Sequence, residues 1–414
     1  MSRSTVSAAG GLAGRPARGA QRLLGFAARA GLARLMRSLE AGELRIELPS
    51  GEPVVCRGPA PGLAADIRFL KWRTGLRLLA GGAVGLAASY RDGEWDSSDL
   101  PTLIEWAARN GDGFAQSIGG LAPLRLANRL AHRRNANTRA GSRRNVVAHY
   151  DLGNDFYRLW LDESMTYSSA IFADPRLTLE EAQDAKSARV IESLRLEGAE
   201  TVLEIGSGWG ALALAIARAS RARVTGLTLS PAQLREAGAR ARNGGLAERL
   251  EFRLMDYRDV DGLFDRIVSV EMIEAVGKAR LPNYFETIRT RLKPGGTCVL
   301  QAITIAEDRF ESYCRAPDFI QTFIFPGGFL PSRRHMLEVL EAQGLRLVGF
   351  ETFGASYART LAEWRRRFLA AWPQVETMGF SPSFMRLWDF YLSYCEGGCR
   401  AGATDVGLYT LAHA

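Results

Sequence analysis

The sequence predicts an α/β protein: a parallel sheet with helices on both faces, preceded by a smaller N-terminal α+β domain. Three observations support this prediction. Apolar, strand-like runs alternate with helical segments between residues 200 and 305. One of these runs ends in a glycine-rich loop. The 414 residues are also enough for two domains, one of them with a large core.

In chain order, we expect a basic, flexible tail over residues 1–29 and a small domain over 30–115. Within the small domain, residues 44–48 alternate between apolar and charged, 49–53 predict a turn, and glycines 81 and 82 predict a hinge. Residues 116–145 follow as a basic linker or surface helix. This part of the chain contains no catalytic constellation.

The large domain is expected over residues 146–414. Its strands are predicted at 202–205, 223–229, 250–255, 266–270, 297–305 and 345–353, with helices between them. An aromatic-rich insertion at 306–332 interrupts the alternation. Because open sheets bind ligands beyond the carboxyl ends of their strands, we expect this insertion to form a lid over the substrate.

The loop after the first strand of the large domain carries the clearest functional signal. Glu204 is followed by Gly206, Gly208 and Gly210, in the spacing G-x-G-x-G. Glycines let the chain turn tightly and let a ligand approach, and the helix that follows presents unpaired N–H groups. A dinucleotide site would use G-x-G-x-x-G and an acid about 20 residues further on. The second strand ends near Thr228 without a carboxylate, so the spacing favours S-adenosylmethionine over NAD.

Five further segments occur in a characteristic order around this loop. They are 145–157 (NVVAHYDLGNDFY), 161–170 (LDESMTYSSA), 226–233 (GLTLSPAQ), 256–259 (DYRD) and 325–332 (FPGGFLPS). Together they resemble the cyclopropane-fatty-acyl-phospholipid synthase family, which includes mycolic acid cyclopropane synthases and related fatty-acid C-methyltransferases. The resemblance extends over roughly residues 30–400. It implies the Rossmann-like fold of class I methyltransferases and a role in lipid biosynthesis.

The family's reaction transfers a methyl(ene) carbon from S-adenosylmethionine to the cis double bond of an unsaturated phospholipid acyl chain, giving a cyclopropane fatty acid. The resemblance assigns the cofactor to a set of residues that the loop already suggests in part. They are Tyr167, Ser168, Glu204, Gly206, Gly208, Gly210, Thr228, Ser230, Gln233, Tyr257 and Arg258. The neutral groups of Thr228, Ser230 and Gln233 suit a ribose, and Tyr257 suits an adenine ring. For Tyr257 alone, a packed surface aromatic is the alternative.

The resemblance also implies a base for the reaction. In the family, a bicarbonate held by Cys, Glu, His and Tyr side chains and one backbone contact removes a proton. The matching side-chain positions are Ser169, Glu274, Gln301 and Tyr357, and the backbone contact is Ile303. Two ligands have therefore changed type, although Ser169 and Gln301 still offer hydrogen bonds to an anion.

Two other residues are catalytic candidates. Cys395 matches a late cysteine that is often assigned to the active site of the family, and His149 is the one histidine that lies in a motif. No metal site is expected, because only Cys395 and Cys399 lie close together and no second pair is nearby.

Position 271 departs from the family pattern. Typical cyclopropane synthases carry glycine there, whereas Glu271 lies three residues before Glu274. Paired carboxylates raise the pKa of one partner toward the working range of a base. The alternative is that Glu271 caps a helix. The variant EMIEAVG at 271–277, with Gln301, resembles a branch that makes methyl-branched or methylene fatty acids, so the product stays open, and we lean toward one other than a simple cyclopropane.

The net charge of +8 is concentrated in two arginine-rich blocks, 1–39 and 125–144, neither of which contains an acid. An anionic membrane surface fits such blocks. The alternatives for the first block are a solvated tail and a transit peptide. No apolar run is long enough to span a bilayer, so membrane contact is expected to be peripheral.

Five scattered cysteines favour the cytoplasm, and hence the inner face of the membrane. A homodimer is left open. No nucleic acid is expected as a partner, since a nucleic-acid methyltransferase would show a base-flipping or binding module. A non-catalytic lipid-binding protein is the rival from another class.

Overall fold

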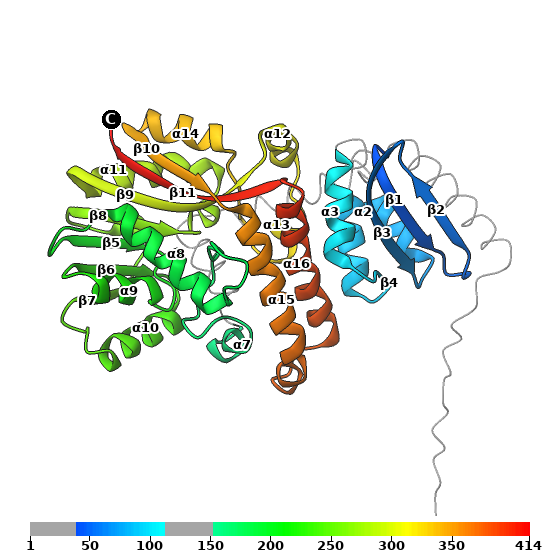
Figure 1. Ribbon diagram of the computed structural model, residues 1–414, viewed down its shortest axis with the longest axis horizontal. Coiled ribbons are helices and arrows are strands. Elements are labelled where there is room, and N and C mark those ends of the chain that lie inside the picture. The colour runs from blue at the N-terminus through cyan, green and yellow to red at the C-terminus, as the bar shows by residue number, and fades with distance from the viewer. Residues whose placement is uncertain (1–38, 112–151) are drawn as a thin grey trace, which may run out of the picture.

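The computed structural model describes residues 39–111 and 152–414 (Figure 1). Several expected features lie outside these residues: both arginine-rich blocks, the linker and His149. Of the first block, only Leu39 is described. The described chain forms a four-stranded sheet and a seven-stranded sheet, separated by two long helices (Figure 1). The expected α/β fold with a smaller N-terminal α+β unit is confirmed.

The N-terminal unit is a small sheet with two helices. Its elements are β1 (Ala41–Glu47), β2 (Pro53–Arg57), β3 (Ala60–Phe69), α2 (Arg73–Arg91), β4 (Trp95–Asp96) and α3 (Leu100–Arg109). The strand order is β2-β1-β3-β4, and β1 pairs antiparallel with β2 across the turn at 49–53. At the expected glycine hinge, Gly82 interrupts α2 with φ +60°, a left-handed conformation that glycine adopts readily.

The larger unit contains the remaining described elements. They are α7 (Asn154–Arg158), α8 (Leu179–Leu194), β5 (Thr201–Ile205), α9 (Ala211–Ala219), β6 (Arg223–Thr228), α10 (Pro231–Asn243), β7 (Leu250–Leu254), η1 (Tyr257–Asp259), β8 (Phe264–Val270), η2 (Ile273–Ala275), η3 (Lys278–Arg280), α11 (Leu281–Arg291), β9 (Leu292–Ile305), α12 (Glu307–Arg315), α13 (Phe319–Phe323), α14 (Arg333–Ala342), β10 (Leu345–Thr352), α15 (Gly354–Thr377), α16 (Pro382–Arg400) and β11 (Thr404–His413).

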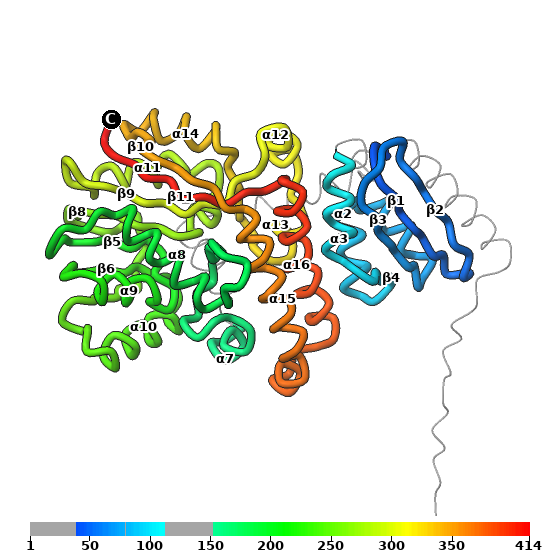
Figure 2. The backbone as a smooth tube through the Cα atoms, in the orientation of Figure 1, coloured from blue at the N-terminus to red at the C-terminus, as the bar shows by residue number. Residues whose placement is uncertain are grey.

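The large sheet has the order β10-β11-β9-β8-β5-β6-β7. Strands β7, β6, β5, β8 and β9 run parallel, whereas β11 pairs antiparallel with both β9 and β10. Figure 2 shows β11 in red, between β10 and β9. The carboxyl ends of β5, β6 and β8 therefore meet at one edge, where the glycine loop begins.

The alternation of side chains along β5 explains why helices cover both faces of this sheet. Val202 packs in a buried cluster with Val190 of α8 and Ile216 of α9. Leu203, on the opposite face, packs in a second cluster with α11 and α14. Because successive strand residues point to opposite faces, two consecutive apolar residues require cover on both sides.

The N-terminal unit packs against α16. The Tyr90 hydroxyl of α2 donates to Asp389 Oδ2 over 2.7 Å, and Arg365 Nε lies 2.6 Å from Asp389 Oδ1. Arg386 donates to the carbonyls of Tyr90 and Trp95, each at 2.6 Å. The small unit is thus bonded directly to the helix that carries Cys395. None of the described helices combines the length and apolar character needed to cross a membrane.

Candidate active site

The glycine loop turns sharply after β5. Gly206, Gly208 and Gly210 have φ values of +88°, +52° and +86°, which favour glycine. A Cβ on Gly206 would lie 2.9 Å from Met272 Cγ, and one on Gly210 would lie 3.0 Å from Ala237 Cβ. A Cβ on Gly208 would meet nothing within 4 Å. The outer glycines therefore permit packing, and Gly208 faces open space that suits a ligand.

Glu204 lies at the end of β5, directly before this loop. Its carboxylate accepts a hydrogen bond from the backbone of Ala213 in α9, and burial raises its pKa to about 8. Its Oε2 atom is buried and has no hydrogen-bond partner among the described residues. An orphaned polar atom beside a glycine cradle fits a polar cofactor.

The residues expected around the ribose and adenine surround the same strand ends. The Ser230 hydroxyl accepts from the Gln233 backbone and caps α10, and the Thr228 hydroxyl donates to Gln233 Oε1 over 2.8 Å. Tyr257 packs edge-on against Tyr284, and Arg258 forms an ion pair with Asp256 at 2.6 Å. Direct contact of these residues with a cofactor stays a prediction.

Glu271 is the centre of a second group of residues, just after β8. Its φ of +47° is unusual for a residue with a side chain. Its Oε1 atom accepts two hydrogen bonds, from the Ser169 backbone N–H and from Gln301 Nε2, both at 2.7 Å. Gln301 Nε2 also reaches the Ser169 carbonyl at 3.2 Å. Glu271 thus links Ser169 and Gln301, and the alternative that it caps a helix is wrong.

Glu274 lies beside Glu271, and both residues are partly buried. Its Oε1 atom accepts from the Ile303 backbone N–H at 2.6 Å, while its Oε2 atom is buried without a partner among the described residues. Burial and the charge of Glu271 raise the pKa of Glu274 to about 8. Burial also raises the pKa of Glu271, but its hydrogen bonds and the charge of Lys186 oppose that rise. At neutral pH, Glu271 is therefore the better candidate for the ionised partner.

Tyr357 and Cys395 reach this region from the two long helices. Tyr357 of α15 is buried, and this burial, together with the charges of Glu271 and Cys395, raises the pKa of its hydroxyl. Burial raises the pKa of the Cys395 thiol, so Cys395 is not prepared as a nucleophile. On α16, one turn earlier, the Tyr391 hydroxyl lies 2.8 Å from that of Tyr167.

The insertion at 306–332 contains the short helices α12 and α13. Its segments are held by polar contacts: the Tyr313 hydroxyl accepts from the Leu330 backbone at 3.0 Å. Its aromatics meet α16, where the rings of Phe325 and Tyr391 lie 6.0 Å apart and those of Phe319 and Phe390 lie 4.7 Å apart. The insertion is thus packed against the helix that carries Cys395.

Two buried polar residues of α8 were not among the site residues predicted from the sequence. Lys186 Nζ donates to Ser168 Oγ at 2.9 Å, and Gln183 Nε2 donates to the Ser168 carbonyl at 2.8 Å. Both face the interior together with apolar residues of α8. Their helical spacing with Leu179 and Val190 is the signal that could have revealed them.

Three features define a class I methyltransferase that uses S-adenosylmethionine. They are the sheet with its single reversed strand, the glycine loop after β5 and the orphaned Glu204 oxygen. The profile of the family described as mycolic acid cyclopropane synthetase matches residues 137–408. The chain belongs to this family.

Three relatives support this assignment. The tuberculostearic acid methyltransferase UfaA1 of Mycobacterium tuberculosis is 39% identical over 339 residues, which cover 80% of this chain and 79% of that protein. The cyclopropane-fatty-acyl-phospholipid synthase of Escherichia coli is 36% identical over 367 residues, covering 88% and 90%. A crystal structure of mycolic acid cyclopropane synthase CmaA1 complexed with SAH and CTAB matches 65% of this chain and 97% of that one, with a TM-score of 0.60 and 31% identity.

The protein is therefore an S-adenosylmethionine-dependent methyltransferase that modifies fatty acids. The structure brings together Ser169, Glu271 and Gln301 by hydrogen bonds, and Glu274 bonds to Ile303 on the strand that carries Gln301. His149 is the one catalytic candidate that lies outside the described residues.

Proposed function

We propose that this protein methylates the cis double bond of an unsaturated phospholipid acyl chain, with Glu271 as the base, and forms a methyl-branched or methylene product. One observation carries the proposal. The Glu271 carboxylate accepts hydrogen bonds from the Gln301 amide, which the family resemblance assigns to bicarbonate, and from the backbone N–H of Ser169, whose side chain the resemblance assigns to bicarbonate.

The chemistry explains why the position of the base decides the product. Bound S-adenosylmethionine supplies an electrophilic methyl group on a sulfonium. When the double bond takes this methyl group on one carbon, a carbocation forms on the other. Removal of a proton from the added methyl closes a ring, whereas removal of a proton from a chain carbon beside the cation leaves an alkene with a methyl branch. If a hydride first shifts from the methylated carbon to the cation, removal of a methyl proton leaves a methylene group instead. In each case the base gains one proton.

The donors of the site favour Glu271 over bicarbonate. Of the donors that the resemblance implies, Gln301 Nε2 bonds to Glu271, the Ser169 hydroxyl donates to the Ala170 carbonyl, and the Ile303 N–H bonds to Glu274. A bicarbonate would need these same donors. The described residues therefore do not fit a bound bicarbonate, and a carboxylate of the chain itself supplies the negative charge.

The cyclopropane product is the second candidate. It is favoured by the Escherichia coli cyclopropane-fatty-acyl-phospholipid synthase, which aligns over 88% of this chain, and by the retention of Glu274 and Tyr357. The tuberculostearic acid methyltransferase, at 39% identity, favours methyl transfer without a ring.

Lipid analysis separates the two products. Cells that express the protein receive methionine with a labelled methyl group, and their fatty acids are examined by mass spectrometry before and after ozonolysis. We expect labelled chains that ozone cleaves, because the double bond is retained. Labelled chains that resist ozone and weigh two hydrogens less than a saturated methyl-branched chain would establish the ring, and chains without label would support a non-catalytic lipid-binding protein.

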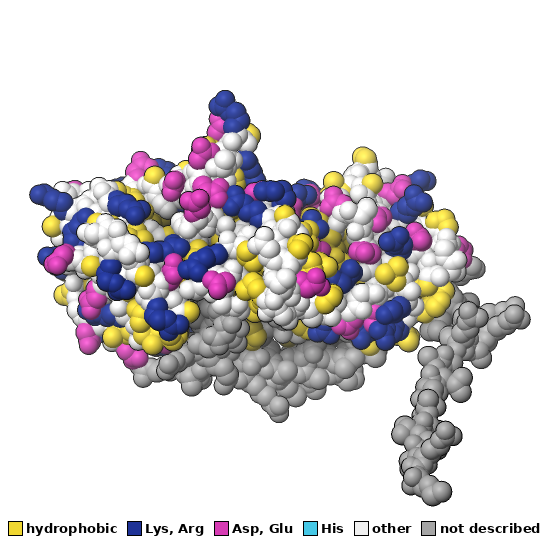
Figure 3. Space-filling model, turned by 90° about the horizontal axis from the view of Figure 1, so that it is seen from below, with side chains coloured by type: hydrophobic (Ala, Val, Ile, Leu, Met, Phe, Trp, Pro, Cys, Tyr) yellow, Lys and Arg dark blue, Asp and Glu magenta, His cyan; other side chains and the backbone are white. Residues whose placement is uncertain are grey.

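The proposal also includes a cytoplasmic location with peripheral contact at the inner, anionic membrane face. The basis for this part of the proposal is the sequence of the two arginine-rich blocks. The face shown in Figure 3 carries basic and acidic side chains side by side, so it adds no separate support. A homodimer at the membrane is left open.

We expect the protein to sediment with anionic vesicles, and the bound fraction to fall strongly from low to high salt, since counterions screen charge pairing. Neutral vesicles of equal size serve as the control. Equal binding to both kinds of vesicle, or binding that ignores salt, would show that the arginines are not the anchor.

A further inference from the structure

Lys186 is a buried cation to which the proposed chemistry assigns no task. It is the one Lys or Arg among the described residues that falls in the fully buried class, with 2% of its surface exposed. A buried ammonium group is costly unless it is paired and hydrogen-bonded. Its partners therefore indicate why it is retained.

Three carboxylates from different elements act on Lys186. Glu271 follows β8, Glu204 ends β5, and Asp162 lies in the segment after α7, and the charge of each raises the lysine pKa. Burial has the opposite and larger effect, so that the pKa of Lys186 is lowered to about 8. The ammonium group thus lies among the acids that surround the cofactor loop and the proposed base.

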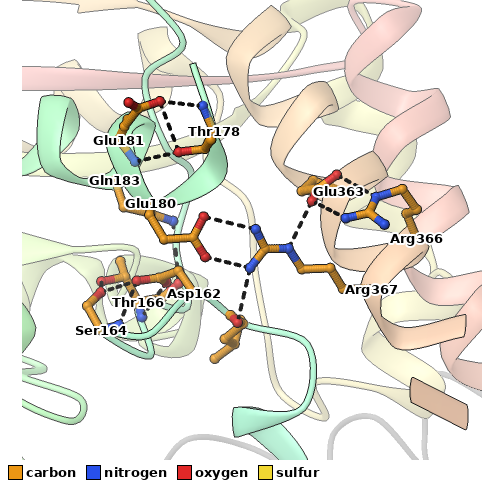
Figure 4. A network of polar contacts seen from close by, with 11 residues as sticks. Asp162, Ser164, Thr166, Thr178, Glu180, Glu181, Gln183, Glu363, Arg366 and Arg367 are labelled. Atoms are coloured by element: carbon orange, nitrogen blue, oxygen red, sulfur yellow. Dashed lines mark hydrogen bonds and ion pairs between the residues drawn. The ribbon is translucent and has the colours of Figure 1, made fainter. Parts of the chain in front are cut away.

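The direct hydrogen bond of Lys186 is to Ser168, the residue before Ser169. The preceding segment is itself ordered, because the Asp162 carboxylate accepts from the backbones of Ser164 at 2.9 Å and Thr166 at 3.0 Å (Figure 4). The dipeptide Ser168–Ser169 is therefore held between α8 on one side and Gln301 of β9 on the other.

Helix α8 gives Lys186 a rigid base. Its N-terminus has a capping box formed by Thr178 and Glu181. Glu180 forms a two-pronged ion pair with Arg367 of α15, at 2.7 and 3.0 Å (Figure 4). A lysine on a fixed helix can hold a loop residue in place.

We infer that Lys186 is a positioning residue for methyl transfer: its ammonium group holds Ser168 so that the Ser169 N–H points at Glu271. Its charge also lowers the pKa of the Glu271 carboxyl. This inference rests on the proposed role of Glu271 as the base.

The sign of the expected effect follows from the surroundings of Glu271. Burial raises the pKa of Glu271, and the Ser169 N–H, Gln301 and Lys186 lower it. Loss of the ammonium group removes one lowering influence, so the pKa rises. The rate requires ionised Glu271, so the ascending limb of the rate–pH curve moves to higher pH. A nearby opposite charge typically shifts a carboxyl pKa by one unit or more, so the limb should move by about one pH unit.

The test compares Lys186→Met, which removes the charge, with Lys186→Arg, which keeps it. We expect Lys186→Met to move the ascending limb of the rate–pH curve to higher pH and to lower turnover about tenfold at the low-pH end of that limb. We expect Lys186→Arg to keep the wild-type midpoint. Lys293→Met is the control, because Lys293 pairs with Asp265 at a half-exposed site away from the loop.

Infrared difference spectra supply a readout that does not depend on turnover. At a pH between the wild-type and variant midpoints, Lys186→Met should show a new carbonyl band of a protonated carboxyl group, and the double variant with Glu271→Gln should lack this band. A wild-type midpoint and no new band in Lys186→Met would overturn the inference. If Glu271→Gln is nevertheless inactive, the proposed base survives that result; if Glu271→Gln is fully active, the proposed function itself fails.

Ser168→Ala provides a second test of the holding role of Lys186, for the case that Lys186→Met does not fold. This variant loses the hydroxyl that Lys186 holds but keeps the charge. We expect a lower rate at every pH with an unchanged midpoint. A wild-type rate in Ser168→Ala would contradict the holding role of Lys186.

Discussion

Replacing Glu271 by glutamine should lower turnover about 10²- to 10⁴-fold, the loss expected when a general base is removed. The glutamine oxygen can still accept from the Ser169 N–H and from Gln301, which now meet at Glu271 Oε1. Geometry is thus preserved, and the ability to take a proton is lost. Turnover of a cis-unsaturated phospholipid and calorimetric binding of S-adenosylhomocysteine are measured together. Binding should stay near the wild-type value.

Two companion variants sharpen this test. Glu251→Gln makes the same chemical change at an exposed strand residue that pairs with Arg253, and should have no effect on turnover. Glu271→Gly removes the side chain at a φ of +47°, which glycine tolerates better, and leaves the Ser169 and Gln301 donors without their acceptor. Added formate or bicarbonate should then restore part of the rate.

The opposite outcome is equally clear. If Glu271→Gln retains full activity, if Glu271→Gly is tolerated without an added anion, and if depletion of bicarbonate slows the wild-type protein, then bicarbonate is the base. Glu274 and Tyr357 would then be required, and the cyclopropane mechanism would be restored.

The backbone conformation at position 271 explains why the family carries glycine there. The family resemblance gives glycine there, and the structure shows a left-handed φ that glycine adopts without strain. A glutamate in this conformation is held by two hydrogen bonds to its carboxylate. Strained residues of this kind gather at functional sites. Sequence spacing predicted that Glu271 and Glu274 would lie together, but not which donors each would meet.

Local pattern predicted the parallel strands well, because each is a short apolar run between turn residues. The expected strands at 202–205, 223–229 and 250–255 correspond to β5, β6 and β7. No element was predicted beyond residue 353, so neither the helix pair α15 and α16 nor the strand β11 was expected. Strand β11 inserts between two strands that were formed earlier in the chain, a long-range pairing that no local signal encodes.

The limit is narrower for Lys186. Its helical spacing with Leu179 and Val190 indicates that it faces inward, but not which groups it meets there. Only the fold shows that α8 turns this side chain toward Ser168 and the acids at the ends of β5 and β8. Its neighbours in space come from segments up to 85 residues away in sequence, as for Glu271, so their convergence depends on the sheet order.

Gly208→Val should abolish measurable binding of S-adenosylmethionine and S-adenosylhomocysteine while leaving the protein folded. A Cβ at Gly208 meets no atom of the described chain within 4 Å, so the added side chain would fill the space that the cofactor needs. Its φ of +52° also strains valine. Gly245→Val separates the two effects: Gly245 has φ +66° and equally open surroundings, but it lies in the turn after α10. Both variants should lose similar thermal stability, and only Gly208→Val should lose binding in calorimetry. Unchanged affinity in Gly208→Val would contradict the placement of the cofactor over this loop.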